Sequence, residues 1–177
     1  MLRSPRTLEA LALRQVIKER GMRNLPSGLV PRMRQELEEL ARIPGEYEIV
    51  DRQTTTYKED REVENQAYKI DLLLGQRIKV SCPTGSTWRV EMTGYDHKFS
   101  LNQETFSTYS KDGFVEDGVL KCEQWMKVDE VGGQKALVNN SLESFHLDPR
   151  SSLIWTYRIY SKIRNETLVL TASTKRI

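Results

Sequence analysis

The sequence has few of the residues on which metal binding, disulfide bonding and catalysis usually depend. Its 177 residues include only two cysteines and two histidines. Cys82 and Cys122 lie far apart and form no Cys-x-x-Cys motif, which argues against a zinc site or a redox pair and favours two free, buried thiols. Gly132-Gly133 lacks the lysine and helix that follow a phosphate-binding loop. We therefore expect no metal and no cofactor.

The two histidines do not form a recognisable catalytic group. His97 lies in GYDHKF and His146 lies in SFHLDP, each close to an expected turn. Each has an aspartate nearby, but neighbouring residues on a strand point to opposite faces, and no activated-serine motif accompanies them. We expect both to be surface turn histidines and the protein not to be an enzyme.

Long apolar runs are also missing. No stretch of about 18 apolar residues is present, so the sequence predicts no helix that spans a bilayer and no membrane partner. The first residues lack the apolar core of a secretory signal, although their arginines and amphipathic spacing leave a mitochondrial presequence open. Glu9 and Glu19 oppose that alternative, and we expect a soluble, cytoplasmic protein.

Charge is present in both signs but is unevenly distributed. The net charge is +2, and residues 1–42 carry nine lysines and arginines against five glutamates. The remainder interleaves basic and acidic residues, whereas a nucleic-acid-binding domain usually gathers its basic residues on one face. The asymmetry marks the N-terminal segment as a distinct unit and argues against nucleic acid as a partner.

That segment predicts two short helices. Ser4-Pro5 suits a helix start, with serine as the N-cap and proline at the first helical position, and Gly21 suits its end. A second helix is expected from Pro31 to Arg42, closed by the sequence Ile43-Pro44-Gly45. Each helix carries one apolar stripe, which must pack against something.

From residue 45 onward the apolar period changes to two, which is typical of strands. The expected strands are Tyr47–Val50, Ala67–Leu74, Arg77–Cys82, Thr87–Thr93, Lys98–Leu101, Val119–Asp129, Lys135–Asn139, Ser152–Lys162 and Thr167–Thr171. Short successive strands without strong helices between them predict a mainly β fold, an antiparallel β-barrel or a β-sandwich preceded by a helical hairpin. The expected division is 1–44 for the helical segment and 45–177 for the β domain, with residues 51–66 as a loop or a long hairpin.

The stretch TLEALALRQV resembles the Elongin-BC-binding box of SOCS-box proteins, a pattern of Ser or Thr, Leu, three residues, Cys or Ala, three residues and an aliphatic residue. The resemblance implies a helix that docks on Elongin BC, with Leu8 as the anchor in a hydrophobic pocket. Leu11, Ala12 and Val16 would complete the contact face.

The sequence that follows resembles the cullin-selecting half of such a box. In that half a Leu-Pro motif precedes a final helix, and Leu25-Pro26 here is followed by Leu29, Met33 and Leu37. The resemblance covers roughly the first forty residues. It departs from most SOCS boxes in having alanine at position 12 and in lying ahead of the other domain.

The β domain is similar to the fatty-acid-binding-protein branch of the calycins, which are ten-stranded antiparallel barrels. IRNETLVLTASTKRI resembles the closing hairpin of that family, and RIYSK resembles its Arg-x-Tyr carboxylate clamp. The resemblance implies a small hydrophobic ligand whose carboxylate is held by Arg158 and Tyr160, or by Arg176 on the last strand. The two matches are mutually exclusive, because RIYSK lies one hairpin too early.

Three hypotheses follow for the function. The first is a non-enzymatic adaptor of a ubiquitin ligase, whose helices dock Elongin BC and a cullin while the β domain recruits a substrate or ligand. The second is an intracellular carrier of a small hydrophobic ligand, with the helices as a lid or brace. The third is a structural subunit of a large assembly. Exposure of Leu8 and Val16 distinguishes the first hypothesis from the second.

Overall fold

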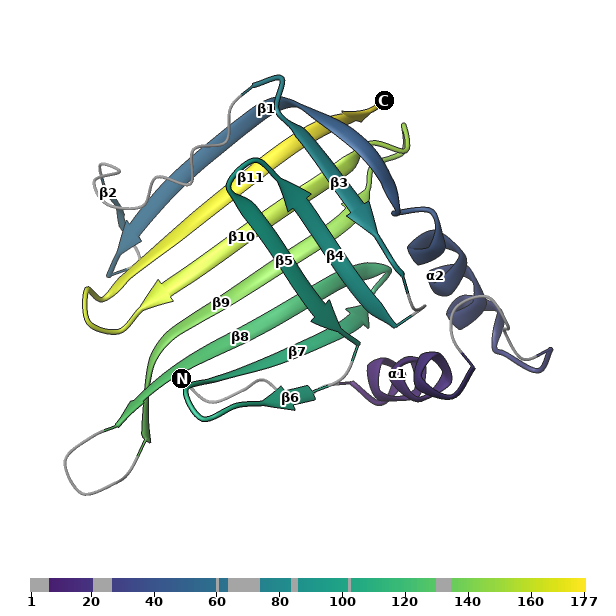
Figure 1. Cartoon of the computed structure of the whole chain (residues 1–177), viewed down its shortest axis with the longest axis horizontal. Coiled ribbons are helices and arrows are strands. Elements are labelled where there is room, and N and C mark those ends of the chain that lie inside the picture. The colour runs from purple at the N-terminus through teal and green to yellow at the C-terminus, as the bar shows by residue number, and fades with distance from the viewer. Residues whose placement is uncertain are drawn as a thin grey trace.

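The computed structural model describes residues 7–20, 27–59, 61–63, 74–83, 86–101, 103–129 and 135–177. Two helices and eleven strands make up the described chain (Figure 1). Their bounds are α1 Leu8–Arg20, α2 Pro31–Ala41, β1 Gly45–Lys58, β2 Arg61–Val63, β3 Arg77–Ser81, β4 Thr87–Met92, β5 Tyr95–Ser100, β6 Gln103–Thr105, β7 Tyr109–Glu116, β8 Val119–Asp129, β9 Lys135–Leu147, β10 Leu153–Ser161 and β11 Glu166–Arg176.

The strands form one antiparallel sheet that curls into a nearly closed barrel, so the mainly β prediction is confirmed in its barrel form. The order is β5-β4-β3-β1-β11-β10-β9-β8-β7-β6, with β2 paired to β1 alone. Most neighbours are consecutive in the chain and joined by short turns. The exception is β1, which pairs with β3 on one side and with β11 on the other.

The barrel closes where β5, at one end of the sheet order, meets β7, the strand next to the other end. Lys111 Nζ on β7 donates a hydrogen bond of 3.0 Å to the carbonyl oxygen of Lys98 on β5. Beside it, Gly113 faces Ser100 so closely that a Cβ at Gly113 would lie 2.2 Å from the Ser100 carbonyl oxygen. Only glycine permits this approach.

We therefore expect Gly113→Ala to destabilise the barrel. The new methyl group meets backbone atoms, which cannot rotate away, and overpacking of this kind costs about 1–3 kcal/mol. Chemical denaturation would measure the loss. Gly28→Ala is the control, because a Cβ there meets nothing within 4 Å; equal effects of the two substitutions would contradict the close approach.

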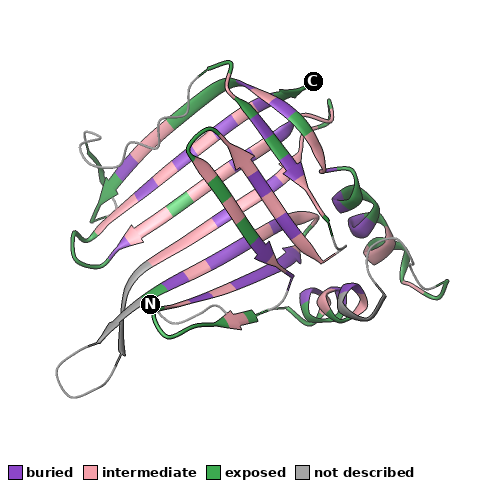
Figure 2. Cartoon of the chain, viewed as in Figure 1, coloured by how far each residue is buried: buried purple, intermediate pink, exposed green. Residues whose placement is uncertain are grey.

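The interior is filled by apolar residues that alternate along the strands, visible as alternating buried and partly buried bands in Figure 2. Its largest fully buried side chains are aromatic. They are Trp88, Trp155, Tyr47, Phe99 and Phe145, from β4, β10, β1, β5 and β9. The Phe145 ring stacks on both Phe99 and Trp155, with centroids 6.0 Å and 6.3 Å apart, so rings from both sides of the barrel meet at its centre.

Strand β1 is longer than the sequence predicted. Residues 51–58 continue the strand, and β2 pairs with them antiparallel. Of the two expected alternatives for this segment, the structure therefore has the hairpin and not the loop. Val50 is exposed because the alternation that buries Tyr47 and Ile49 points it outward. A register shift between Ile49 and Asp51 then changes the inward positions, so that Thr56 is buried further along the strand. The expected strand Ala67–Leu74 lies outside the described residues except for Leu74, which is in a turn.

The two helices cover one end of the barrel, next to β7 and β3 (Figure 1). Helix α1 begins at Leu8, where Thr7 Oγ1 accepts a hydrogen bond of 3.1 Å from the backbone N–H of Ala10. Threonine thus caps the helix in place of the expected Ser4, which is outside the described residues. Helix α2 begins with proline at its first turn, as predicted. Side chains of both helices belong to the same apolar core as those of the barrel.

Candidate functional site

Helix α1 has an inner and an outer apolar face. The inner face is fully buried on the barrel and consists of Ala10, Leu13 and Ile17, which are spaced by three and four residues. On the outer face Leu8 is 86% exposed and Leu11 is 44% exposed. The helix therefore carries more apolar surface than the barrel covers, and the excess points away from it.

A buried ion pair fixes how α1 is turned. Arg14 Nη2 donates to both carboxylate oxygens of Asp112 on β7, at 2.8 Å and 3.0 Å. The Asp112 side chain is fully buried, and that of Arg14 is 15% exposed. Because Arg14 flanks the inner face, this contact holds the opposite side of α1 toward solvent.

The predicted partner-binding residues divide into three groups. Leu8, Leu11 and Ala12 are exposed together on the outer face of α1. The others described are Val16, Leu29 and Met33, which are half-buried and pack against the core. Leu25 and Pro26 lie outside the described residues. The structure thus exposes Leu8, Leu11 and Ala12 of the first half of the expected docking box and partly covers Val16 together with the described residues of the second half.

The three predicted ligand-binding residues do not form a binding site inside the barrel. Arg158 is exposed and Tyr160 half-buried on one face of β10, while Trp155 on the opposite face is in the core. Both therefore lie on the outside of the barrel. Arg176 belongs to another contact, since its Nη2 donates to the carbonyl oxygen of Arg42 at 2.6 Å and to the hydroxyl of Tyr47 at 2.7 Å.

A buried polar cluster in the barrel interior was not predicted. Its centre is Glu143 on β9, whose side chain is 3% exposed. Glu143 Oε1 accepts hydrogen bonds from the hydroxyl of Tyr95 at 2.5 Å and from Nε1 of Trp155 at 3.0 Å. Glu143 Oε2 lies 3.1 Å from His97 Nε2, within ion-pairing distance but without an aligned hydrogen bond. The cluster joins β5 to β9 and β10 across the interior.

The expectation that His97 lies at the surface is wrong, because its side chain is 13% exposed and faces Glu143. The signal was available: Tyr95, His97 and Phe99 are spaced by two, so a buried Phe99 places His97 on the inner face of β5. His146 is half-buried on β9, and burial lowers its pKa.

The interior environment keeps nearby groups uncharged. Burial first, and then the adjacent Glu143 carboxylate, raise the pKa of Tyr95 and of the Cys122 thiol well above their usual ranges. The same two causes raise the pKa of Tyr157. A protonated, buried thiol is a poor nucleophile, and the Tyr95 proton already serves a hydrogen bond to Glu143. The cluster is built to hold strands together more than to transfer protons.

Other kinds of site find no support within the described ranges. Cys122 is buried as expected, whereas Cys82 is only half-buried, and no disulfide joins the two. No group of three or more His, Cys, Asp or Glu residues in those ranges could hold a metal ion. Among the described helices, none has the length and apolar character needed to cross a membrane.

Comparisons with known proteins add only a distant structural likeness. No protein-family model matches the sequence, and no curated protein matches it. A solved structure with a similar trace is a mutant of the vaccine antigen transferrin-binding protein B from Haemophilus parasuis Hp5. The two are 14% identical with a TM-score of 0.32, over 76% of this chain and 26% of that chain. The chain therefore spans about a quarter of that protein, and the likeness carries no argument about function.

Proposed function

We propose that the chain is a non-enzymatic binding protein that docks a partner protein through the outer face of α1. The observation that supports this most is the exposure of Leu8, Leu11 and Ala12 on a helix whose other face is already buried. An amphipathic helix that only braced the barrel would need no apolar residues on its outer side.

The outer face has the geometry of a helix that lies in a groove. Leu8 and Ala12 are four residues apart and follow one line along the helix, with Leu11 beside it, and the half-buried Val16 continues that line to the edge of the core. Leu8 is more exposed than Leu11 and suits a pocket, and the small Ala12 lets a partner backbone come close. Thr7, which the docking pattern also requires, caps the helix.

Elongin BC is the first candidate partner, because these residues are the ones through which the sequence resembles its binding box. The proposal is limited to the contact between α1 and Elongin BC. A cullin contact through Leu29 and Met33 is not supported, because both side chains are half-buried against the core. The non-enzymatic part of the proposal rests on the interior cluster, whose tyrosine and tryptophan donors are both directed at Glu143.

We expect Leu8→Ser to weaken Elongin BC binding strongly without affecting the fold. Loss of a central anchor residue costs about 2 kcal/mol or more, which is about a 30-fold loss of affinity. Since Leu8 is 86% exposed, the melting temperature should stay close to that of the unsubstituted chain. Titration calorimetry with purified Elongin BC, beside thermal unfolding of each variant, measures both quantities.

Ile163→Ser is the matched control, because Ile163 is 82% exposed in the turn between β10 and β11, away from the helices. It should bind as tightly as the unsubstituted chain. Failure of the unsubstituted chain to bind would remove Elongin BC as the partner, and equal binding by the Leu8→Ser variant would exclude the outer face of α1.

A further inference from the structure

Strand β5 is held by a backbone ladder on one side and by side chains on the other. Among the described strands its ladder is with β4 alone. Towards β7 it has the hydrogen bond from Lys111 and the close approach at Gly113. Across the interior it reaches β9 through three side chains, which are Tyr95, His97 and Phe99 (Figure 1). The outer edge of the β4–β5 hairpin is therefore fastened to the barrel largely by side-chain contacts.

His97 lies in the middle of these interior contacts. The centroid of its ring is 5.9 Å from that of Tyr95 and 5.3 Å from that of Phe99. Its Nε2 lies 3.1 Å from Oε2 of Glu143. Tyr95 and Trp155 both donate to the other oxygen, Oε1, so Oε2 faces the imidazole. Nε2 is buried without an aligned hydrogen bond, which means that the contact depends on the charge of the ring.

A histidine in this position has two states of different bonding strength. Neutral imidazole has a single N–H, whereas imidazole that has taken up a proton from solvent donates from both nitrogens and is cationic. The contact with a carboxylate then becomes a charge-assisted hydrogen bond, roughly twice as strong as a neutral one. Histidine is the side chain that ordinarily changes its charge between about pH 5 and pH 8.

The other titratable groups around this contact keep their charge over that range. Three of them stay protonated, because burial first and then the Glu143 carboxylate raise their pKa values; they are Tyr95, Tyr157 and Cys122. Lys111 of β7 is a cation whose Nζ donates to the seam backbone. Asp96 lies on the outer face of β5, where Arg89 holds it at 2.8 Å and lowers its pKa. Among the described residues, Glu143 is thus the charge that meets His97 in the interior.

We propose that His97 and Glu143 form a proton-operated clasp on the seam of the barrel. When His97 takes up a proton, the ion pair ties the β4–β5 hairpin to β9. When His97 releases the proton, the pair loses its charge and the hairpin is held more loosely. The 13% exposure of the His97 side chain lets solvent reach the ring, while the 3% exposure of Glu143 keeps the pair poorly screened.

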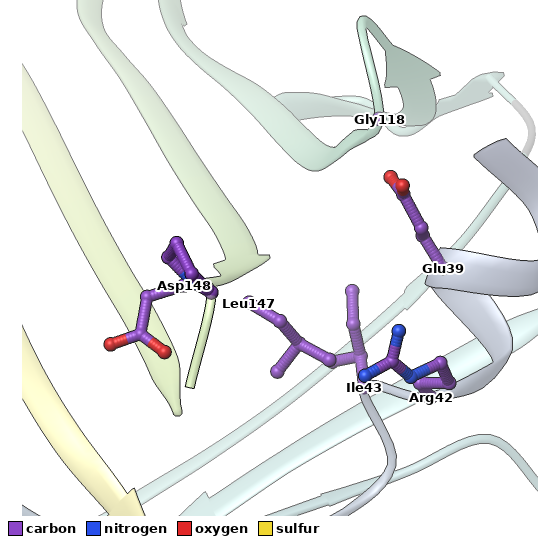
Figure 3. A pocket seen from close by; sticks show the side chains of 7 residues that line it. Glu39, Arg42, Ile43, Gly118, Leu147 and Asp148 are labelled. Atoms are coloured by element: carbon purple, nitrogen blue, oxygen red, sulfur yellow. The ribbon is translucent and has the colours of Figure 1, made fainter. Parts of the chain in front are cut away.

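The clasp is separate from a surface pocket at the helix end of the barrel. That pocket, of about 310 Å³, lies between α2 and the β9–β10 turn, where Ile43 and Leu147 face one another (Figure 3). Two of its charged residues serve internal contacts: Arg42 Nη2 donates to Ser151 Oγ at 2.8 Å, and Asp148 Oδ1 accepts from two backbone N–H groups of its own turn at 2.9 Å. No residue of the clasp lines the pocket.

The test is hydrogen exchange of the isotope-labelled full chain, followed by NMR at about pH 5.5 and about pH 8. Conversion of the rates to protection factors removes the intrinsic pH dependence of exchange. Relative to the amides of β10 and β11, those of β4 and β5 should be protected roughly tenfold better at the lower pH. A histidine that gains a partner on folding contributes its stability at low pH and loses it as the pH rises. Equal relative protection at the two pH values would overturn the proposal.

Two substitutions make the test specific. His97→Gln leaves a side chain that is neutral at both pH values, and Glu143→Gln removes the charge that attracts the imidazolium. Each should abolish the difference in relative protection between the two pH values. If one variant does not fold, the other still decides. A pH dependence that persists in a folded variant of either kind would mean that the clasp is not its source.

His146→Gln is the matched control, because the chain has only two histidines. His146 is half-buried on the outer face of β9, away from Glu143 on the inner face. The control should keep the full difference in protection, and its loss would assign the effect to His146 and disprove the clasp. Leu8→Ser should also keep it, so the clasp and the proposed docking face of α1 succeed or fail separately.

Discussion

Arg14→Met should lower the free energy of unfolding by about 3–5 kcal/mol, the cost of removing one partner from a buried ion pair. Methionine keeps much of the length and apolar character of the arginine stem but takes the guanidinium away from Asp112, which is fully buried. The substitution also removes the contact that turns the inner face of α1 toward the barrel. For a chain of this size the melting temperature should fall by about 10 °C or more.

A double-mutant cycle separates the ion pair from simple loss of packing. Asp112→Asn removes the buried charge, so Arg14→Met in that background should cost much less than it does alone. Denaturant unfolding of the four chains gives the coupling energy. A coupling energy near zero would mean that the close Arg14–Asp112 contact does not stabilise the protein and that α1 is held by Ala10, Leu13 and Ile17 alone.

Glu143→Leu should destabilise the protein by about 2–6 kcal/mol, because two buried donors lose their acceptor at about 1–3 kcal/mol each. The donors are the hydroxyl of Tyr95 and the indole N–H of Trp155, which come from strands on different sides of the interior. The near-ultraviolet circular dichroism spectrum should change as well, because the ring centroids of Trp155 and Tyr95 lie 5.7 Å apart and the two rings would repack.

Glu143→Gln is the control for this prediction. It keeps one acceptor oxygen and the side-chain volume, so its cost should be well below that of Glu143→Leu. A Glu143→Leu variant that is as stable as the unsubstituted chain, or more stable, would contradict this prediction. That result would mean that the barrel keeps a buried carboxylate at a cost to stability, which is expected of residues retained for function.

The sequence predicts the barrel well because alternation of apolar residues is a local signal. Strands β3, β4, β8 and β10 could be placed from it almost in full, and Thr167–Thr171 of β11 as well. Strand β7 was missed because YSKDGFVE contains Lys-Asp-Gly, which is typical of a turn. In the fold the Asp112 carboxylate pairs with Arg14 of α1, and the missing side chain at Gly113 lets β5 approach β7 closely. Both turn-like residues thus make contacts with segments distant in sequence.

The candidate site was predictable to a similar degree. The helical spacing placed Leu8, Leu11, Ala12 and Val16 on one apolar stripe, but it did not identify the second apolar face, of Ala10, Leu13 and Ile17, which the barrel buries. Which face is buried depends on Arg14, whose partner lies in the strand that was missed. The Glu143 cluster was out of reach for the same reason, because it joins three strands that only the folded barrel brings together.

The pairing of β1 with β11 has a consequence for how the protein can be made. Of the described strands, β1 is synthesised first and β11 last, yet the two form the longest described ladder, from Tyr47 with Arg176 to Lys58 with Glu166. During synthesis the edge of β1 that pairs with β11 stays unpaired until β11 has been made. Contacts between segments so distant in sequence also form slowly. The barrel can be completed only after translation has passed β11. Until then the nascent chain has an open strand edge, which is where a chaperone would be expected to act.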